Sequence, residues 1–171
     1  QLELDLSDAD QKKVLDRLVK LGASKQTITA DDLPFIIAEV LASKEYQHVK
    51  LLNCSVTSGL DLDSTVSIRV NINGKEHLAS GSGNGGYDAF IHAIEKVLSQ
   101  YKYNLPRLAD YEVRIPKGGL TSALTECVIT WDCGGRMRKT RGVHANQVFA
   151  AVLATLRIIN MQLHEAKLEA K

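Results

Sequence analysis

The sequence predicts an α+β fold, in which two βββα units related by pseudo-twofold symmetry follow a small helical linker subdomain. Two observations support this prediction. Short runs of alternating apolar and polar residues, typical of half-buried strands, are followed by a longer run with helical spacing. The same order of patterns occurs twice, and Gly81 in the first copy matches Gly142 in the second, 61 residues later.

Each copy contains a predicted β-hairpin with a further strand in front of it. The alternating run of the first copy reaches an Asn-Gly pair at 73–74, and that of the second reaches a Gly-Gly pair at 134–135. Alternation on both sides of such a pair is a hairpin signal. The preceding strands are predicted at 49–57 and 108–115.

A helix is predicted after each hairpin, at about 86–101 and 145–166. Three antiparallel strands covered by one helix leave a sheet edge and an apolar face exposed. Two units, or two chains, can bury these faces against each other. We therefore expect residues 48–171 to form one domain from two repeats, about 48–104 and 105–171, and the chain to form a homodimer.

Residues 1–47 are predicted to form the helical linker subdomain. Its first helix begins at the capping segment Ser7–Asp10 and ends near Gly22. The second opens at Thr29–Asp32, with Pro34 in its first turn. Two short helices bury little apolar surface alone, so we expect a linker here rather than a binding site.

The composition argues against several classes of protein. A net charge of +1 over 171 residues gives no attraction to nucleic acid or membrane. No apolar run approaches the roughly 20 residues that cross a bilayer. The acidic start lacks the basic segment of a signal peptide, and without an initiator Met the chain is expected to be a piece of something longer. Three cysteines, an odd number in strand-like runs, favour a reducing cytoplasm over a disulfide framework.

The glycine-rich turn Gly81–Asp88 is the most informative segment, because it stands where a strand-like pattern gives way to a helical one. A glycine-rich turn that opens a helix exposes N–H groups at the positive end of the helix dipole. The N–H groups of Asn84 to Tyr87 could therefore hold a carboxylate, and the Asp88 side chain could pair with an ammonium group. Together these features describe an amino-acid site.

Two other interpretations of this turn stay open. Gly81, Gly83 and Gly86 fit the G-x-G-x-x-G dinucleotide fingerprint, which requires a parallel βαβ unit. The preceding segment, 75–80, is instead the return arm of an Asn-Gly hairpin and hence antiparallel. The turn could also bind nothing, in which case Asp88 would only complement the helix dipole.

The predicted strand 108–115 supplies a second candidate element. In a regular strand, Tyr111 and Ile115 share one face, and Leu108 lies on the opposite face. Tyr111 would either pack on the sheet or line a ligand. Elsewhere, the histidines and cysteines lack metal-ligand spacing, and no catalytic triad or carboxylate pair can be assigned. The basic strand at 136–141 has no interleaved aromatic residues, so it is expected to protect a sheet edge rather than bind nucleic acid.

Three ordered motifs within about 48–166 resemble the C-terminal regulatory domain of the 2-isopropylmalate synthase family, which includes the citramalate synthases. They are Gly83–Ala89 at a helix start, Leu108–Tyr111 on a strand, and Gly142–Asn146 before the last helix. Where the family usually has Pro-Val in the first motif, this chain has Gly86 and Tyr87. We expect Gly86 to loosen the turn and Tyr87 to add a ring to the pocket.

The resemblance implies a homodimer that binds a branched-chain amino acid as feedback inhibitor near the dimer interface. The chain is somewhat more similar to citramalate synthases, which implies isoleucine; leucine in a 2-isopropylmalate synthase domain, or a dimerisation module without ligand, are the alternatives. The implied effector-binding residues are Asn84, Gly85, Tyr87, Asp88, Leu108, Tyr111, Ile115, Thr121 and Ala123.

The resemblance also places catalysis outside these 171 residues. The parent transferase would condense acetyl-CoA with a 2-oxo acid, pyruvate for citramalate, on a separate barrel domain that uses a divalent metal. No eightfold βα pattern is present, and the chain is too short for such a barrel. We therefore expect no catalytic residue, no metal site and no cofactor in this segment, and no activity from it alone.

Overall fold

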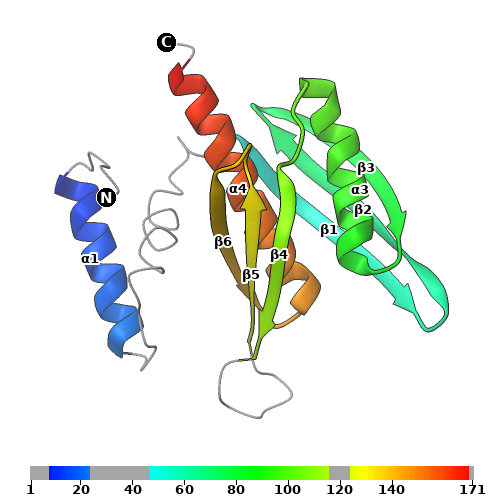
Figure 1. Cartoon of the computed structure of the whole chain (residues 1–171), viewed down its shortest axis with the longest axis horizontal. Helices are drawn as coiled ribbons and strands as arrows, with labels where there is room; N and C mark the ends of the chain where they lie inside the picture. The colour runs from blue at the N-terminus through cyan, green and yellow to red at the C-terminus, as the bar shows by residue number, and fades with distance from the viewer. Residues whose placement is uncertain (1–7, 24–46, 116–123, 170–171) are drawn as a thin grey trace. The chain divides into compact units, whose positions relative to one another are not determined.

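The computed structural model describes residues 8–23, 47–115 and 124–169 (Figure 1). The chain divides into two compact units, Gln1–Gln47 and His48–Lys171. In the first unit, helix α1 spans Asp8–Ala23, where the sequence predicts a helix. The helix predicted to open at 29–32 lies outside the described residues. Over the part of the chain that is described, no helix is long and apolar enough to cross a membrane.

The second unit contains two three-stranded antiparallel sheets, each followed by a helix, which confirms the predicted α+β fold of two βββα units. The first sheet has the order β1 (Val49–Gly59), β2 (Leu62–Ile72), β3 (Lys75–Gly83). The second has the order β4 (Arg107–Arg114), β5 (Thr125–Asp132), β6 (Met137–His144). The helices are α3 (Gly86–Leu98), which continues as the 3₁₀ turn η2 (Ser99–Tyr101), and α4 (Gln147–Glu169).

The hairpin turns form where the sequence predicts them. Asn73 and Gly74 join β2 to β3 with positive φ angles of 51° and 89°, a conformation that Asn-Gly pairs favour. Gly134 and Gly135 have φ angles of 72° and 88° between β5 and β6. These positive angles favour residues that tolerate left-handed backbone, and they explain the glycines at both positions.

The central strands β2 and β5 alternate between buried and exposed residues, and the helices cover their buried faces. Val66, Ile68 and Val70 point inward from β2 and are at most 1% exposed. Buried side chains from both βββα units form one continuous cluster. The two repeats therefore share a core, as expected for units that cannot each bury an apolar face alone.

Glycine allows each helix to lie directly on the last strand of its own sheet. A Cβ atom on Gly81 of β3 would overlap the carbonyl oxygen of Ala89 in α3, and one on Gly142 of β6 would overlap that of Ala150 in α4. In both repeats the contact joins the end of the third strand to the helix that follows it. The equivalence of Gly81 and Gly142 predicted from the repeat is confirmed by these matching contacts.

We predict that Gly142→Ala destabilises the domain by roughly 1–3 kcal/mol, the range for overpacking a close-packed interior. The new methyl group would have to displace the α4 backbone, which cannot move as a flexible side chain does. Urea unfolding at fixed protein concentration measures the loss. Gly85→Ala is the matched control, because a Cβ atom there would meet no other atom within 4 Å and its φ is −153°. Equal losses in the two variants would contradict the prediction.

Candidate functional site

Helix α3 begins with an open N-terminus. Gly85 occupies the N-cap position with an extended backbone, φ −153° and ψ 167°, and no side chain there hydrogen-bonds to the helix. The first N–H groups of any helix have no partner within the helix. Here they lie at the positive end of the helix dipole without a side-chain cap, so an anionic group would be stabilised at this end.

Asp88, in the first turn of α3, folds back toward the preceding loop. Its Oδ2 accepts a hydrogen bond from the backbone N–H of Asn84 at 3.0 Å. Gly83 makes room for this arrangement, because a Cβ atom there would overlap the Asp88 carboxylate. In this conformation the Asn84 N–H, which the sequence assigns to the ligand, is therefore occupied by Asp88. The N–H groups of the first helical turn remain as donors.

The other carboxylate oxygen of Asp88 is oriented toward His92. Asp88 Oδ1 lies 3.9 Å from His92 Nε2, one helical turn further along α3. The Asp88 side chain is 47% exposed, so a cationic group from solution can reach it. The carboxylate is thus held in place by one oxygen and accessible through the other.

Tyr87 connects the start of α3 to β4 and α4. Its ring lies 5.3 Å from that of Tyr111, centroid to centroid, with an angle of 43° between the planes. Its hydroxyl is 2.8 Å from Thr155 Oγ1 on α4. Because the Thr155 hydroxyl donates to the carbonyl oxygen of Ala151, Tyr87 is the donor in this pair. The structure therefore brings together two aromatic residues that the sequence assigns to one site.

A β-bulge in β4 changes which face Leu108 occupies. The register shifts between Leu108 and Asp110, so that Leu108 pairs with Trp131 and Tyr111 pairs with Ile129. Both partners are buried on the inner face of β5. Leu108 and Tyr111 therefore share a face, and the predicted opposite placement is wrong, because one extra residue in a strand reverses its alternation.

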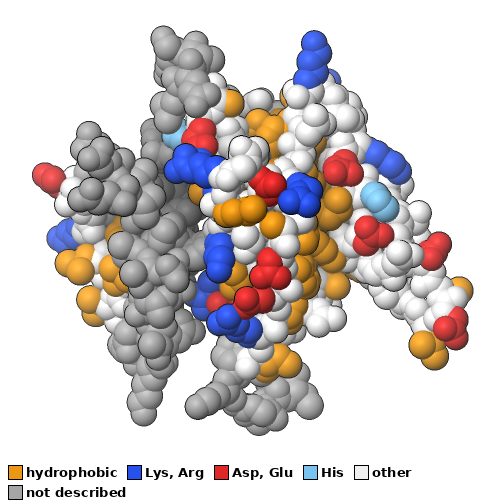
Figure 2. All heavy atoms as spheres, viewed as in Figure 1, with side chains coloured by type: hydrophobic (Ala, Val, Ile, Leu, Met, Phe, Trp, Pro, Cys, Tyr) orange, Lys and Arg blue, Asp and Glu red, His pale blue; other side chains and the backbone are white. Residues whose placement is uncertain are grey.

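The inner face of β4 is an exposed apolar surface. Leu108, Tyr111 and Val113 are 40%, 37% and 41% exposed, although their partners on β5 are buried. Ile115, one residue beyond the strand, is 69% exposed. Figure 2 shows hydrophobic side chains gathered along the seam between β4 and α3. An apolar edge strand of this kind is normally covered by a ligand or a partner.

The predicted effector-binding residues fall into three groups. Asn84, Gly85, Tyr87 and Asp88 lie at the start of α3, and Leu108, Tyr111 and Ile115 lie on β4 or directly after it. Thr121 and Ala123 lie outside the described residues. His92, which sequence reasoning did not assign to the site, joins the first group through its spacing of four residues from Asp88.

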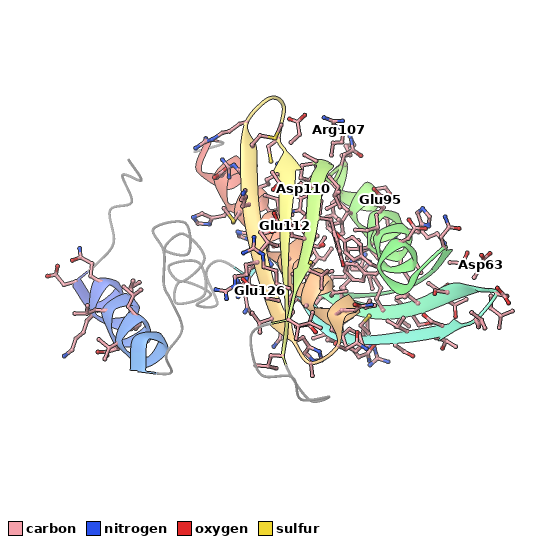
Figure 3. All side chains as sticks on the ribbon, turned by 60° about the horizontal axis from the view of Figure 1, so that its bottom comes forward. Asp63, Glu95, Arg107, Asp110, Glu112 and Glu126 are labelled. Atoms are coloured by element: carbon pink, nitrogen blue, oxygen red, sulfur yellow. The ribbon has the colours of Figure 1, made fainter. Side chains whose placement is uncertain are left out.

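Two acidic side chains of β4 point away from this seam. Asp110 and Glu112 alternate with Tyr111 and so point to the other face of β4, the face of the sheet on which Glu126 of β5 also lies (Figure 3). Glu126 forms an ion pair with Arg141 of β6. Within the described ranges, no group of three His, Cys, Asp or Glu side chains could hold a metal ion.

A cavity of about 640 Å³ lies at the corresponding strand-to-helix turn of the second βββα repeat. Residues from β1, β5 and the start of α4 line it: Val56, Ser58, Thr125, Ala145, Asn146, Gln147, Val148 and Phe149. No sequence argument predicts this cavity. Asn146 Oδ1 accepts hydrogen bonds from the N–H groups of Val148 at 2.8 Å and Phe149 at 3.4 Å, so this helix start is capped by its own side chain. None of the described residues that line the cavity is charged, so none of them offers a charged partner to either end of an amino acid.

Gly86 is the point where the two turns meet. A Cβ atom on Gly86 would lie 2.7 Å from Val56 Cγ1 and 3.3 Å from Val148 Cγ2. Gly86 is buried between these side chains. The expectation that Gly86 loosens the turn is therefore wrong, because this glycine permits close packing of α3 against β1 and α4.

The family model described as the LeuA allosteric (dimerisation) domain matches residues 27–163. A relative from Methanothermobacter thermautotrophicus named "Putative (R)-citramalate synthase CimA" is 32% identical over 98% of this chain and 34% of its own length. The (R)-citramalate synthase of Methanocaldococcus jannaschii is 28% identical over 94% of this chain and 33% of its own length. The 2-isopropylmalate synthase of Aquifex aeolicus is 27% identical over 94% of this chain and 30% of its own length. The chain thus spans about a third of the length of these relatives.

We predict that Tyr87, Tyr103 and Tyr111 ionise late, because burial raises the pKa of each above the usual value. Below the unfolded-state pKa of about 10, these tyrosines are neutral in both states and do not lower the free energy of unfolding. As the pH rises above that value, the unfolded chain ionises first, so the free energy of unfolding falls. Absorbance of tyrosinate, followed with pH in native buffer and in guanidinium chloride, measures the difference. Tyr87→Phe should remove one late-ionising group; the same titration curve in native buffer and in guanidinium chloride would contradict the prediction.

Proposed function

Because the chain belongs to the family of LeuA allosteric (dimerisation) domains, we propose that it is the amino-acid-binding regulatory segment of a citramalate synthase-like enzyme. The proposal rests on the groups at the start of α3. Its N–H groups have no side-chain cap, and the half-exposed carboxylate of Asp88 stands beside them. The Tyr87–Tyr111 pair adds an apolar surface next to these polar groups.

The carboxylate, the ammonium group and the side chain of an α-amino acid each have a matching group in this arrangement. Its carboxylate would accept hydrogen bonds from the first-turn N–H groups of α3. Its ammonium group would pair with Asp88, and its aliphatic side chain would lie against Tyr111 and the apolar face of β4. Leu108 shares that face. Asn84, Gly85, Ile115, Thr121 and Ala123 complete the proposed site.

We propose isoleucine as the effector, because several relatives are named (R)-citramalate synthase. The relative named 2-isopropylmalate synthase supports leucine as the second candidate. Both are branched aliphatic amino acids, so the polar part of the site would serve either. Tyr87 and Tyr111 would decide between them through the shape of the apolar wall.

The proposed mechanism is allosteric and acts in a homodimer. An amino acid that binds one arrangement of the dimer more tightly than another shifts the equilibrium toward it. The exposed inner face of β4 is suited to a site that is completed at an interface. The parent enzyme would condense acetyl-CoA with pyruvate for isoleucine biosynthesis in the cytoplasm, on a separate metal-dependent domain. The segment described here would regulate that reaction without catalysing it.

Isothermal titration calorimetry of the 171-residue chain with isoleucine, leucine and valine tests the proposal. We expect isoleucine to bind with a dissociation constant below about 1 mM, equivalent to roughly 4 kcal/mol, and the other two to bind more weakly. Stronger binding of leucine would move the assignment to a 2-isopropylmalate synthase domain.

If none of the three binds at millimolar concentration, the effector proposal fails. Sedimentation equilibrium then identifies the remaining alternative, because a stable dimer without a ligand is a dimerisation module. Thermal stabilisation by NAD or ATP, and not by amino acids, would instead support the dinucleotide or nucleotide interpretation of the glycine turn.

We predict that Asp88→Asn weakens amino-acid binding by about 1–3 kcal/mol, the range for losing a charged hydrogen bond. The substitution keeps a side-chain oxygen that can accept from the Asn84 N–H, so the fold should stay intact. Calorimetry gives the affinity, and urea unfolding checks the fold. Asp63→Asn, at the tip of the β1–β2 hairpin (Figure 3), is the matched control and should leave binding unchanged. Equal affinities in both variants would place the ammonium group elsewhere.

A further inference from the structure

We propose that the cavity at the start of α4 is a second binding site, whose ligand is an uncharged molecule with an apolar body and one amide or hydroxyl group. The cavity volume of about 640 Å³ lies within the range of small-molecule sites, about 300–1,000 Å³. None of the described residues that line it belongs to the proposed amino-acid site. Binding in this cavity therefore does not require that an amino acid binds at the start of α3.

The cavity lies at the turn of the second repeat that corresponds to the candidate site of the first. The offset between the repeats matches Tyr87 to Val148 and Asp88 to Phe149. At the start of α4, a small valine therefore takes the place of a large aromatic ring, and a phenylalanine takes the place of the carboxylate. The same scaffold thus presents a cavity at the second turn, lined by uncharged side chains.

The start of α4 offers few free donors to an anion. Asn146 Oδ1 accepts hydrogen bonds from the N–H groups of Val148 and Phe149, at 2.8 and 3.4 Å. The carbonyl oxygen of Asn146 accepts from the N–H of Ala150. None of the described lining residues carries a charge that could hold a carboxylate, a phosphate or an ammonium group. Because a charge removed from water without a partner is costly, we infer an uncharged ligand.

Three side chains of the lining keep hydrogen-bond capacity for a polar group. Thr125 is only 7% exposed, and its hydroxyl has no hydrogen-bond partner among the described residues. Asn146 caps the helix through Oδ1, which leaves the two N–H donors of its Nδ2 group. Gln147 is exposed and adds an amide that can donate and accept. The fourth polar side chain, that of Ser58, already pairs with the Ser64 hydroxyl at 2.8 Å.

The unpaired hydroxyl of Thr125 favours a ligand that forms hydrogen bonds. Buried polar groups in folded proteins almost always have a partner, because leaving one unpaired is unfavourable. A ligand hydroxyl or amide both donates and accepts, so it can pair with the Thr125 hydroxyl and with the Asn146 Nδ2 group. A purely apolar ligand would leave both of these groups without a partner.

Apolar side chains form the rest of the lining. Val56 lies on β1, and Ala145, Val148 and Phe149 lie at the start of α4. The Phe149 ring packs edge to face against the His144 ring at 5.2 Å, which limits its movement. A ring or a branched aliphatic group can pack against these side chains. The cavity thus combines an apolar wall with a small number of polar groups, as small-molecule sites commonly do.

A series of probes with the same ring and different polar groups tests the proposal. Benzamide, benzyl alcohol, toluene, benzoate and benzylammonium are each added to the whole chain at neutral pH and followed by two-dimensional NMR of its N–H groups. We expect benzamide and benzyl alcohol to shift the resonances of Thr125, Asn146 and Phe149, with dissociation constants on the order of millimolar. The other three probes should bind at least about fivefold more weakly, because each leaves polar groups or a charge without a partner.

Two variants of β5 test the role of the Thr125 hydroxyl. Thr125→Val keeps the shape of the side chain, and we expect it to weaken benzamide binding roughly three- to tenfold. It should not lower the urea concentration at which the chain unfolds, because the hydroxyl has no partner to lose. Thr130→Val, on the opposite face of the same strand, is the matched control and should leave binding unchanged. Ala145→Leu, which fills part of the cavity, should weaken the binding of benzamide and of benzyl alcohol.

Several results would overturn the proposal. They are the absence of shifts with benzamide and benzyl alcohol at about 20 mM, well above the expected dissociation constants, tighter binding of benzoate or benzylammonium than of benzamide, and equal benzamide binding by Thr125→Val and the unaltered chain. Displacement of benzamide by isoleucine would place both in one site and would also overturn it. A chain that binds benzamide here and no amino acid would overturn the proposed function alone.

Discussion

The close approach of each helix to its own sheet is the constraint on which this domain depends. Gly81 and Gly142 leave no Cβ atom where the backbone of α3 and α4 crosses the last strand of each sheet. In a close-packed interior a single methyl group at such a crossing cannot be accommodated without moving backbone. The crossing fixes where each helix starts relative to its strand. Two contacts of the first half of α3, between Asp88 and the Asn84 N–H and between His92 and the Ser82 carbonyl oxygen, follow from that position.

The two repeats keep the same scaffold but differ in the chemistry of their turns. In the first, Gly83 gives space for the Asp88 carboxylate, and no side chain caps the helix. In the second, the equivalent residues are His144 and Phe149, whose rings pack edge to face at 5.2 Å, and Asn146 caps the helix. A charge and open donors therefore exist at only one of the two described turns. The symmetric fold thus carries two chemically different turns, and only the first has the groups on which the proposed amino-acid site depends.

Contacts between the repeats join the candidate site to the rest of the domain. Gly86 lies against Val56 and Val148, and Tyr87 donates a hydrogen bond to Thr155 of α4. At the far side of the same core, Asn160 of α4 bonds to both the N–H and the carbonyl oxygen of Val49 at 2.8 and 2.9 Å. A ligand at the start of α3 would therefore touch side chains that belong to the packing of both repeats. Packed elements with such shared contacts can carry a change from one site to another.

The sequence by itself determined the strands, hairpin turns, helices and repeat, because alternation, Asn-Gly pairs and helical spacing are local patterns. It also identified Tyr87, Asp88 and Tyr111 as residues of one region. Only the tertiary structure decided that Leu108 faces inward, since the bulge at Ala109 depends on pairing with β5 and has no local signal. The same holds for Gly83 and Gly86, whose role depends on which atoms would meet a Cβ, and for His92, whose partner on β3 is ten residues away in sequence. Local periodicity specifies which way a side chain points within a regular element. Contacts between elements specify what it meets there.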